Sequence, residues 1–183
     1  MKPIPAVVTP LDEHMGLDIA RSLGRQGIPV YGLDPDPHAA GGKSRYCQLV
    51  TCPDPKKSEA DYLQFLADWG KQLGSKAVLY ALSDDVALLC SRERGALQAY
   101  YEYVMPDHAS MVKLASKAGL ALAAQECGIP APQTFMPRDA QELERAAAQL
   151  SFPAILKPVE GVYWHTPTLA ARPTPSARSA CAT

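Results

Sequence analysis

Two lysines stand at positions where a positive charge is unusual. Lys157 ends the apolar run 154–157, and Lys117 falls in the first turn of an expected helix, where the helix dipole disfavours a cation. Taken singly, Lys157 is typical of a gatekeeper on an edge strand, and Lys117 of a solvated surface lysine. Taken together, the two ammonium groups favour a phosphate-binding site.

A second candidate site is the run Ser83-Asp84-Asp85, directly after the apolar segment 77–82. Open α/β sheets bind ligands at the carboxyl ends of their strands, which is where these side chains are expected. The competing interpretation is that one of them caps the following helix, because Ser and Asp accept hydrogen bonds from free helix N–H groups. A metal site is weakly indicated, since a third oxygen ligand is missing nearby in the sequence.

Asp34 follows the second expected strand, the place of a ribose-binding acid in dinucleotide-binding folds. The glycine fingerprint of those folds is absent, because Gly16 stands alone after the first strand. Asp12 and Glu13 in the same loop would repel a pyrophosphate. We therefore expect no nicotinamide or flavin cofactor, and Asp34 to act as a loop cap or to face a small substrate.

Cysteines and histidines give no metal or disulfide pattern. The five cysteines contain no C-x-x-C pair, and the four histidines are scattered without paired spacing. We expect no zinc site and no disulfide framework.

The first 106 residues alternate between strand-like and helix-like segments. A strand at 4–9, a helix at 15–26 and a strand at 29–33 have the length of a βαβ unit. Further strands are expected at 46–50, 77–82 and 103–105, with helices at 58–73 and 86–91. The pattern predicts a doubly wound α/β domain with a parallel, Rossmann-like sheet over residues 1–106.

After Pro106 the expected elements change to helix pairs. Asp107 caps one helix, and a second runs from Ser116 to a stop at Gly128, a helix-ending glycine like Gly27. Asp139 with Glu142 resembles a capping box for a third helix. Short strands are expected at 133–136 and 154–157.

Composition excludes several classes of protein. Lys and Arg total 18 and Asp and Glu 19, for a net charge of -1, so no basic field attracts nucleic acid. Hydrophobic residues make up 47% of the 183, enough for a sizeable core. A signal peptide and an apolar run of about 18 residues are both missing. We expect a cytoplasmic protein with no membrane partner, and the sequence leaves the oligomeric state open.

The order of these motifs resembles a known family. SKAGLALAAQECGIPAPQTF (Ser116–Phe135), a capped helix and FPAILKP (Phe152–Pro158) look like the entry to the nucleotide-binding domain of the ATP-grasp ligases. GLDIARSLGRQGIPVYGLD (Gly16–Asp34), SRY (Ser44–Tyr46) and LSDD (Leu82–Asp85) resemble the preceding Rossmann-like domain of carboxylate-amine ligases, D-aspartate ligase-like members included.

The resemblance implies a function that the residues alone do not give. Lys117 and Lys157 occupy the two positions whose lysines reach ATP phosphates in that family. The implied activity uses ATP and Mg²⁺ to convert a carboxylate into an acyl phosphate, which a small amine then attacks. Asp34 and Ser83–Asp85 are the substrate-binding candidates.

The resemblance ends at Pro158, before the family's glycine-rich loop and magnesium ligands. We expect an incomplete ATP-grasp lobe at 107–160, a frame change or premature stop near Glu160, and an unstructured tail at 161–183, rich in Ala, Thr and Pro. Such a truncated chain should be inactive alone. The alternative is a stand-alone, non-catalytic binding or regulatory module, and a nicotinamide-dependent oxidoreductase is a distant third.

Overall fold

The computed structural model describes residues 3–12 and 14–157. The chain forms two compact units, the first covering residues 1–111 and the second beginning at Val112. The expected break near Glu160 and the tail at 161–183 lie outside the described residues.

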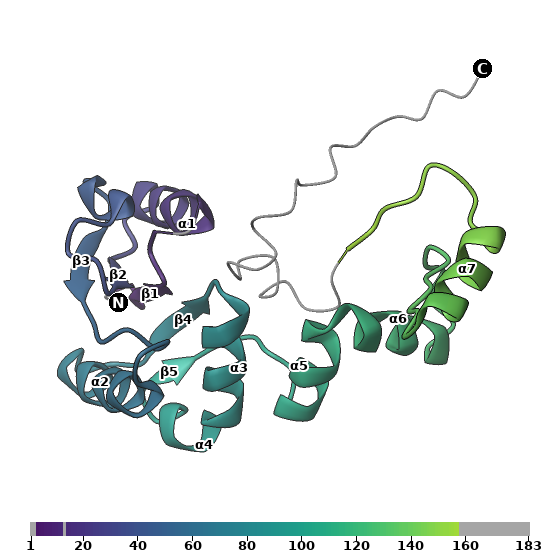
Figure 1. Cartoon of the computed structure of the whole chain (residues 1–183). Helices are drawn as coiled ribbons and strands as arrows, with labels where there is room; N and C mark the ends of the chain where they lie inside the picture. Colours follow the sequence, from purple (N-terminus) through teal and green to yellow (C-terminus); the bar gives the residue numbers. More distant parts are fainter. Residues whose placement is uncertain (1–2, 13, 158–183) are drawn as a thin grey trace. The chain divides into compact units, whose positions relative to one another are not determined.

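The first unit contains a five-stranded sheet in the order β3-β2-β1-β4-β5 (Figure 1). Every neighbouring pair of strands is parallel. The strands are β1 (Ala6–Thr9), β2 (Val30–Asp34), β3 (Gln48–Thr51), β4 (Ala77–Ala81) and β5 (Tyr101–Glu102). The expected α/β class and the Rossmann-like parallel sheet are confirmed.

Helices cover both faces of this sheet, as a doubly wound fold requires. They are α1 (His14–Arg25), α2 (Glu59–Gln72), α3 (Asp84–Arg92) and the short α4 (Arg94–Leu97), with a 3-10 turn η1 (Ala40–Lys43) before β3. The first helix packs on one face, where Ala20 lies in a cluster with Val8 and Val30. The opposite face carries the larger cluster, in which Tyr62 and Leu66 of α2 contact the sheet.

The helix ends follow from local sequence. Ser58 caps α2 by accepting a hydrogen bond from the Asp61 amide. Gly27 ends α1 with a φ of 75°, and the Ile28 amide then donates to the Leu23 carbonyl. That is a Schellman motif, in which a residue without Cβ takes the left-handed conformation at little cost.

The second unit is helical in the described part of the chain. α5 (His108–Ala115) crosses from the first unit into the second, and α6 (Lys117–Glu126) and α7 (Ala140–Gln149) follow. Ser116 caps α6 and Asp139 caps α7, each by accepting a backbone amide hydrogen bond. The capping box of α7 is altered, because the Glu142 carboxylate accepts from the Arg138 amide.

Three expected strands differ from the structure. The segments 133–136 and 154–157 contain no strand. A strand exists only where a neighbour accepts and donates its backbone hydrogen bonds, and the described part of the second unit has no such neighbour. The strand expected at 103–105 is instead β5 at Tyr101–Glu102, because the register with β4 pairs Ala77 with Tyr101.

Candidate functional site

The strand order places a topological switch point between β1 and β4. The chain proceeds from β1 to β2 and β3 on one side and then crosses to β4 on the other. In open parallel sheets, ligands bind outside the carboxyl ends of the strands at this point. The edge formed by the segments after Thr9, Asp34 and Ala81 is therefore the candidate site, here called the carboxyl edge.

Thr9 is the last residue of β1 and lies buried beside the carboxyl edge. Its hydroxyl lies 2.6 Å from the Tyr62 hydroxyl of α2, and both side chains are almost completely buried. Burial raises the pKa of Tyr62 well above its ordinary value, so the phenol stays protonated. The sequence analysis missed this pair, since a threonine ending an apolar strand looks ordinary and its partner is 53 residues away.

Asp34 lies at the carboxyl edge, but the residue is only 4% exposed. Oδ2 accepts a hydrogen bond from the Asp12 amide at 2.9 Å, and Oδ1 accepts one from the Asp36 amide at 3.0 Å. Asp12 in turn accepts from the Ala40 amide at 2.9 Å. Asp34 thus ties the loop after β1 to the loop after β2, which is the geometry of a loop cap.

Ser83, Asp84 and Asp85 come directly after β4, on the other side of β1. Ser83 caps α3, its Oγ accepting from the Val86 amide at 3.4 Å. Asp84 and Asp85 occupy the first turn of α3 and are exposed. Ser83 therefore caps the following helix, as the competing interpretation in the sequence analysis expected of one of these three residues. The carboxylates of Asp84 and Asp85 remain available to solvent or to a ligand.

Leu11 fills the turn between β1 and α1. Its side chain is fully buried, and a Cβ added to Gly32 or Gly41 would lie 2.4 Å or 2.7 Å from Leu11 side-chain atoms. A Cβ on Gly16 would lie 2.4 Å from the Leu11 carbonyl oxygen. Glycine at these positions makes room for Leu11, which packs the turn after β1.

Lys117 and Lys157 both lie in the second unit. Lys117 is the first residue of α6, directly after the cap Ser116, and its side chain is exposed. Lys157 is also exposed, in a segment with neither helix nor strand. Both ammonium groups are accessible to an anion, and Lys157 does not end a strand as expected.

Two further features bear on ligands. Within residues 3–12 and 14–157, no group of three or more His, Cys, Asp or Glu could hold a metal ion. A cavity of about 330 Å³ lies near the amino ends of β4 and β5, away from the carboxyl edge. Its walls include Lys76, Arg94, Gln98, Tyr101, Glu102 and Tyr103.

None of the described helices is long and apolar enough to span a membrane.

Comparisons with known proteins give a match by structure. No family model matches the chain, and no curated protein matches it by sequence. The fold is similar to a solved biotin carboxylase domain of a single-chain bacterial carboxylase, with a TM-score of 0.52 and 19% sequence identity. The match covers 79% of this chain and 34% of that one, so this chain spans about a third of the solved protein. At this identity the likeness establishes a shared fold.

Proposed function

We propose that this chain is the N-terminal part of an ATP-dependent ligase of the ATP-grasp superfamily, of the type that joins a carboxylate to an amine. The observation that carries the proposal is the position of Lys117 and Lys157 in motifs that resemble the phosphate-binding lysine motifs of that family. The similarity of the fold to a biotin carboxylase domain supports it, because biotin carboxylase is itself an ATP-grasp enzyme.

In this proposal the two lysines hold the phosphates of ATP. Both side chains are exposed, so water solvates their ammonium groups until a nucleotide binds. An ammonium acts as a point charge on a phosphate, and a charge-assisted hydrogen bond of this kind contributes about 1.5–3 kcal/mol. Lys117 also leads α6, whose free N-terminal amides favour the same anion.

The carboxyl edge of the first unit is the proposed substrate-binding surface. Asp84 and Asp85 present two exposed carboxylates, which suit the ammonium group of an amine substrate. Asp34 and Ser83 shape the edge through their backbone hydrogen bonds, and Asp34 is too buried to make more than a partial contact with a ligand.

The proposed reaction also calls for magnesium, which when bound would supply positive charge to offset the charge on the transferred phosphoryl group. The described residues hold no cluster suited to it, so its ligands would come from outside them. The acyl phosphate forms when a substrate carboxylate oxygen attacks the γ-phosphorus and ADP leaves. The amine then attacks the carbonyl carbon and displaces inorganic phosphate.

The proposal is tested by titrating the purified chain with ATP and monitoring binding by NMR of the backbone amides. We expect weak, saturable shifts around Lys117 and Lys157, and no ATP hydrolysis above background. Lys117→Met and Lys157→Met should each weaken binding, by about 3 kcal/mol at most.

Lys113→Met is the matched control, because Lys113 is in the same unit but pairs with Glu126. It should leave ATP affinity unchanged. Equal ATP affinity in both lysine variants would show that these are the wrong residues. Magnesium-dependent turnover by this chain alone would contradict the fragment assignment. Saturable binding of a small carboxylate at the carboxyl edge, with no ATP binding, would instead favour a stand-alone binding module.

A further inference from the structure

The segment between β5 and α5 has no regular structure, yet side chains hold it at several points. Residues 103–107 form neither helix nor strand, and Val104 is fully exposed. This segment, here called the connector, belongs to the first unit and continues through α5 toward Lys117. A connector without backbone pairing has little intrinsic order, so any order must come from side-chain contacts.

Arg94 supplies the first of these contacts. Its Nη2 donates to the Met105 carbonyl at 2.7 Å and to the Pro106 carbonyl at 2.8 Å, two consecutive acceptors on the connector. Its guanidinium also lies over the Tyr103 ring, 4.9 Å from the centroid. A planar guanidinium can stack on the Tyr103 ring while one of its nitrogens donates to both carbonyls, whereas a compact lysine ammonium cannot stack on the ring.

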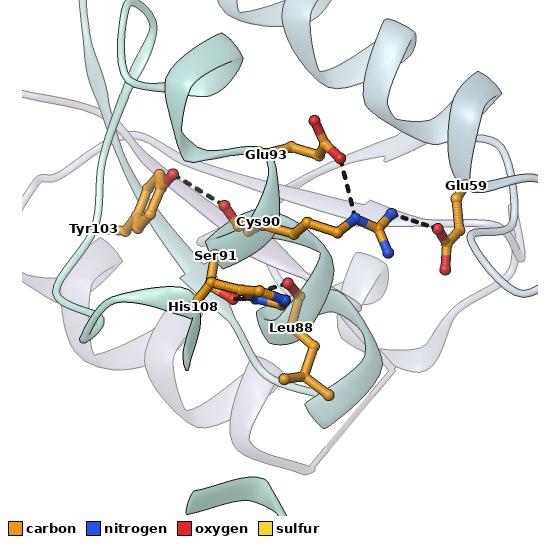
Figure 2. Close-up of polar contacts among 8 residues, drawn as sticks. Glu59, Leu88, Cys90, Ser91, Glu93, Tyr103 and His108 are labelled. Carbon is orange, nitrogen blue, oxygen red and sulfur yellow. Dashed lines mark hydrogen bonds and ion pairs between the residues drawn. The ribbon is translucent and has the colours of Figure 1, made fainter. Parts of the chain in front are cut away.

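The last turn of α3 supplies two more contacts, visible in Figure 2. The Tyr103 hydroxyl donates to the Cys90 carbonyl at 3.1 Å. Ser91 Oγ lies 2.8 Å from the Leu88 carbonyl and 2.8 Å from Nδ1 of His108, the first residue of α5. Because the hydroxyl hydrogen is directed to Leu88, the serine oxygen accepts from His108, whose Nδ1 must carry hydrogen.

The Ser91–His108 contact is not a nucleophile and its base. A catalytic serine donates its hydrogen to the imidazole, whereas here Ser91 donates to a helix carbonyl and accepts from the ring. Ser91 is also only 4% exposed, so a substrate has no access to its oxygen. The contact therefore holds the start of α5 against α3.

We propose that Arg94, Tyr103 and Ser91 form a clamp that fixes the connector and the first turn of α5 on α3 and α4, and that they act as positioning residues for α5, the helix that leads to Lys117. The last part rests on the proposed function. If Lys117 binds ATP phosphate, an ordered start of α5 reduces the entropy that this helix loses when ATP is bound.

Limited chymotrypsin cleavage after Tyr103 and hydrogen exchange at the Ser110 and Met111 amides test the clamp on the full chain. The Met111 amide donates to the Asp107 carbonyl, so its exchange reports the first turn of α5. Arg94→Ala should raise cleavage about tenfold, because proteolysis requires local opening of the connector. Ser91→Ala should speed exchange at Ser110 and Met111 several-fold while changing cleavage less.

Arg92→Ala is the matched control, since Arg92 ends α3 two residues before Arg94 but pairs with Glu59 and Glu93. It should change neither readout. Arg94→Lys, which keeps the charge and loses the planar group stacked on Tyr103, should be cleaved nearly as fast as Arg94→Ala.

Several results would overturn the clamp. One is an unchanged rate of cleavage after Tyr103 in Arg94→Ala. Another is a cleavage rate in Arg94→Lys that equals that of the wild type. Equal acceleration of exchange in β1 and β4 would show that Arg94 merely stabilises the first unit. Both readouts are taken without nucleotide, so failure of ATP binding leaves the test of the clamp intact.

Discussion

At the residue scale, the buried polar pair Thr9 and Tyr62 is the contact that joins the carboxyl edge to the core. The two hydroxyls satisfy each other at 2.6 Å in a region without solvent. A buried hydroxyl that loses its partner keeps its full desolvation cost, whereas removing both partners together can be nearly neutral. The carboxyl edge therefore depends on this pair for its shape.

We expect Tyr62→Phe to lower the free energy of unfolding by about 1–3 kcal/mol, because it leaves the Thr9 hydroxyl unpaired. Urea unfolding followed by circular dichroism measures this change. The double variant Thr9→Val with Tyr62→Phe should recover part of the loss. A neutral Tyr62→Phe, or a double variant whose loss equals the sum of the single losses, would contradict this account of the pair.

At the element scale, much of the structure could be predicted because its signals are local. Gly27 and Gly128 end α1 and α6 with positive φ and the same Schellman hydrogen bonds, so the Gly-Ile-Pro found at 27–29 and at 128–130 is the same kind of helix stop. The strand expected after Gly128 does not form, because pairing depends on a distant neighbour that the local sequence does not specify. The same reason explains the absence of a strand at 154–157.

The stability of the first turn of α5 should decrease at low pH. Hydrogen bonds from the Ser110 hydroxyl and then the Ser110 amide lower the pKa of Asp107, which caps the helix. A lowered pKa in the folded state means that the stabilisation is complete above the ordinary aspartate value of about 3.9 and is lost as pH falls through the lowered pKa.

Carbon-detected NMR titration of the Asp107 carboxyl measures that pKa directly. In the wild type it should lie below the ordinary value, and in Ser110→Ala it should move upward, since the largest cause of the shift has been removed. Ser22→Ala, which changes a serine of α1, is the control and should leave the Asp107 pKa unchanged. An Asp107 pKa that does not respond to Ser110→Ala would refute this account of the cap.

At the scale of the whole molecule, the two units differ in how much they bury. The first unit has core clusters on both faces of its sheet. Among the described residues of the second unit, Ala146 is the one buried hydrophobic side chain, while Phe152, Ile155 and Leu156 are 78–80% exposed. Exposed apolar side chains that gather in one patch are typical of surfaces that bind another polypeptide segment.

Only part of the candidate site could be predicted from the sequence. The placement of Asp34 at the end of β2 and of Ser83–Asp85 after β4 could be predicted, because each closes an apolar segment in an alternating strand-helix pattern. The roles of Thr9 and Leu11 could not, since each depends on residues brought close only by the fold. The phosphate role of Lys117 and Lys157 rests on resemblance and remains a prediction.

We expect the full chain to bind a hydrophobic dye such as anilinonaphthalene sulfonate, and a fragment of residues 1–111 to fold cooperatively without binding it. The reason is that the exposed apolar side chains are concentrated after Met111. Dye fluorescence and urea unfolding of the two proteins measure this difference. Equal dye binding by both, or a fragment without a cooperative transition, would contradict the division into units.

The most direct test of the central claim is to map which lysines react with an acyl-phosphate derivative of ATP. The amine of a lysine beside the bound phosphates attacks the acyl carbon, and ATP leaves, so mass spectrometry of the acylated peptides identifies the phosphate-binding lysines. The account predicts acylation of Lys117 and Lys157 that excess ATP prevents, with Lys71 and Lys113 unaffected by ATP. Labelling spread over the exposed lysines and insensitive to ATP would contradict it.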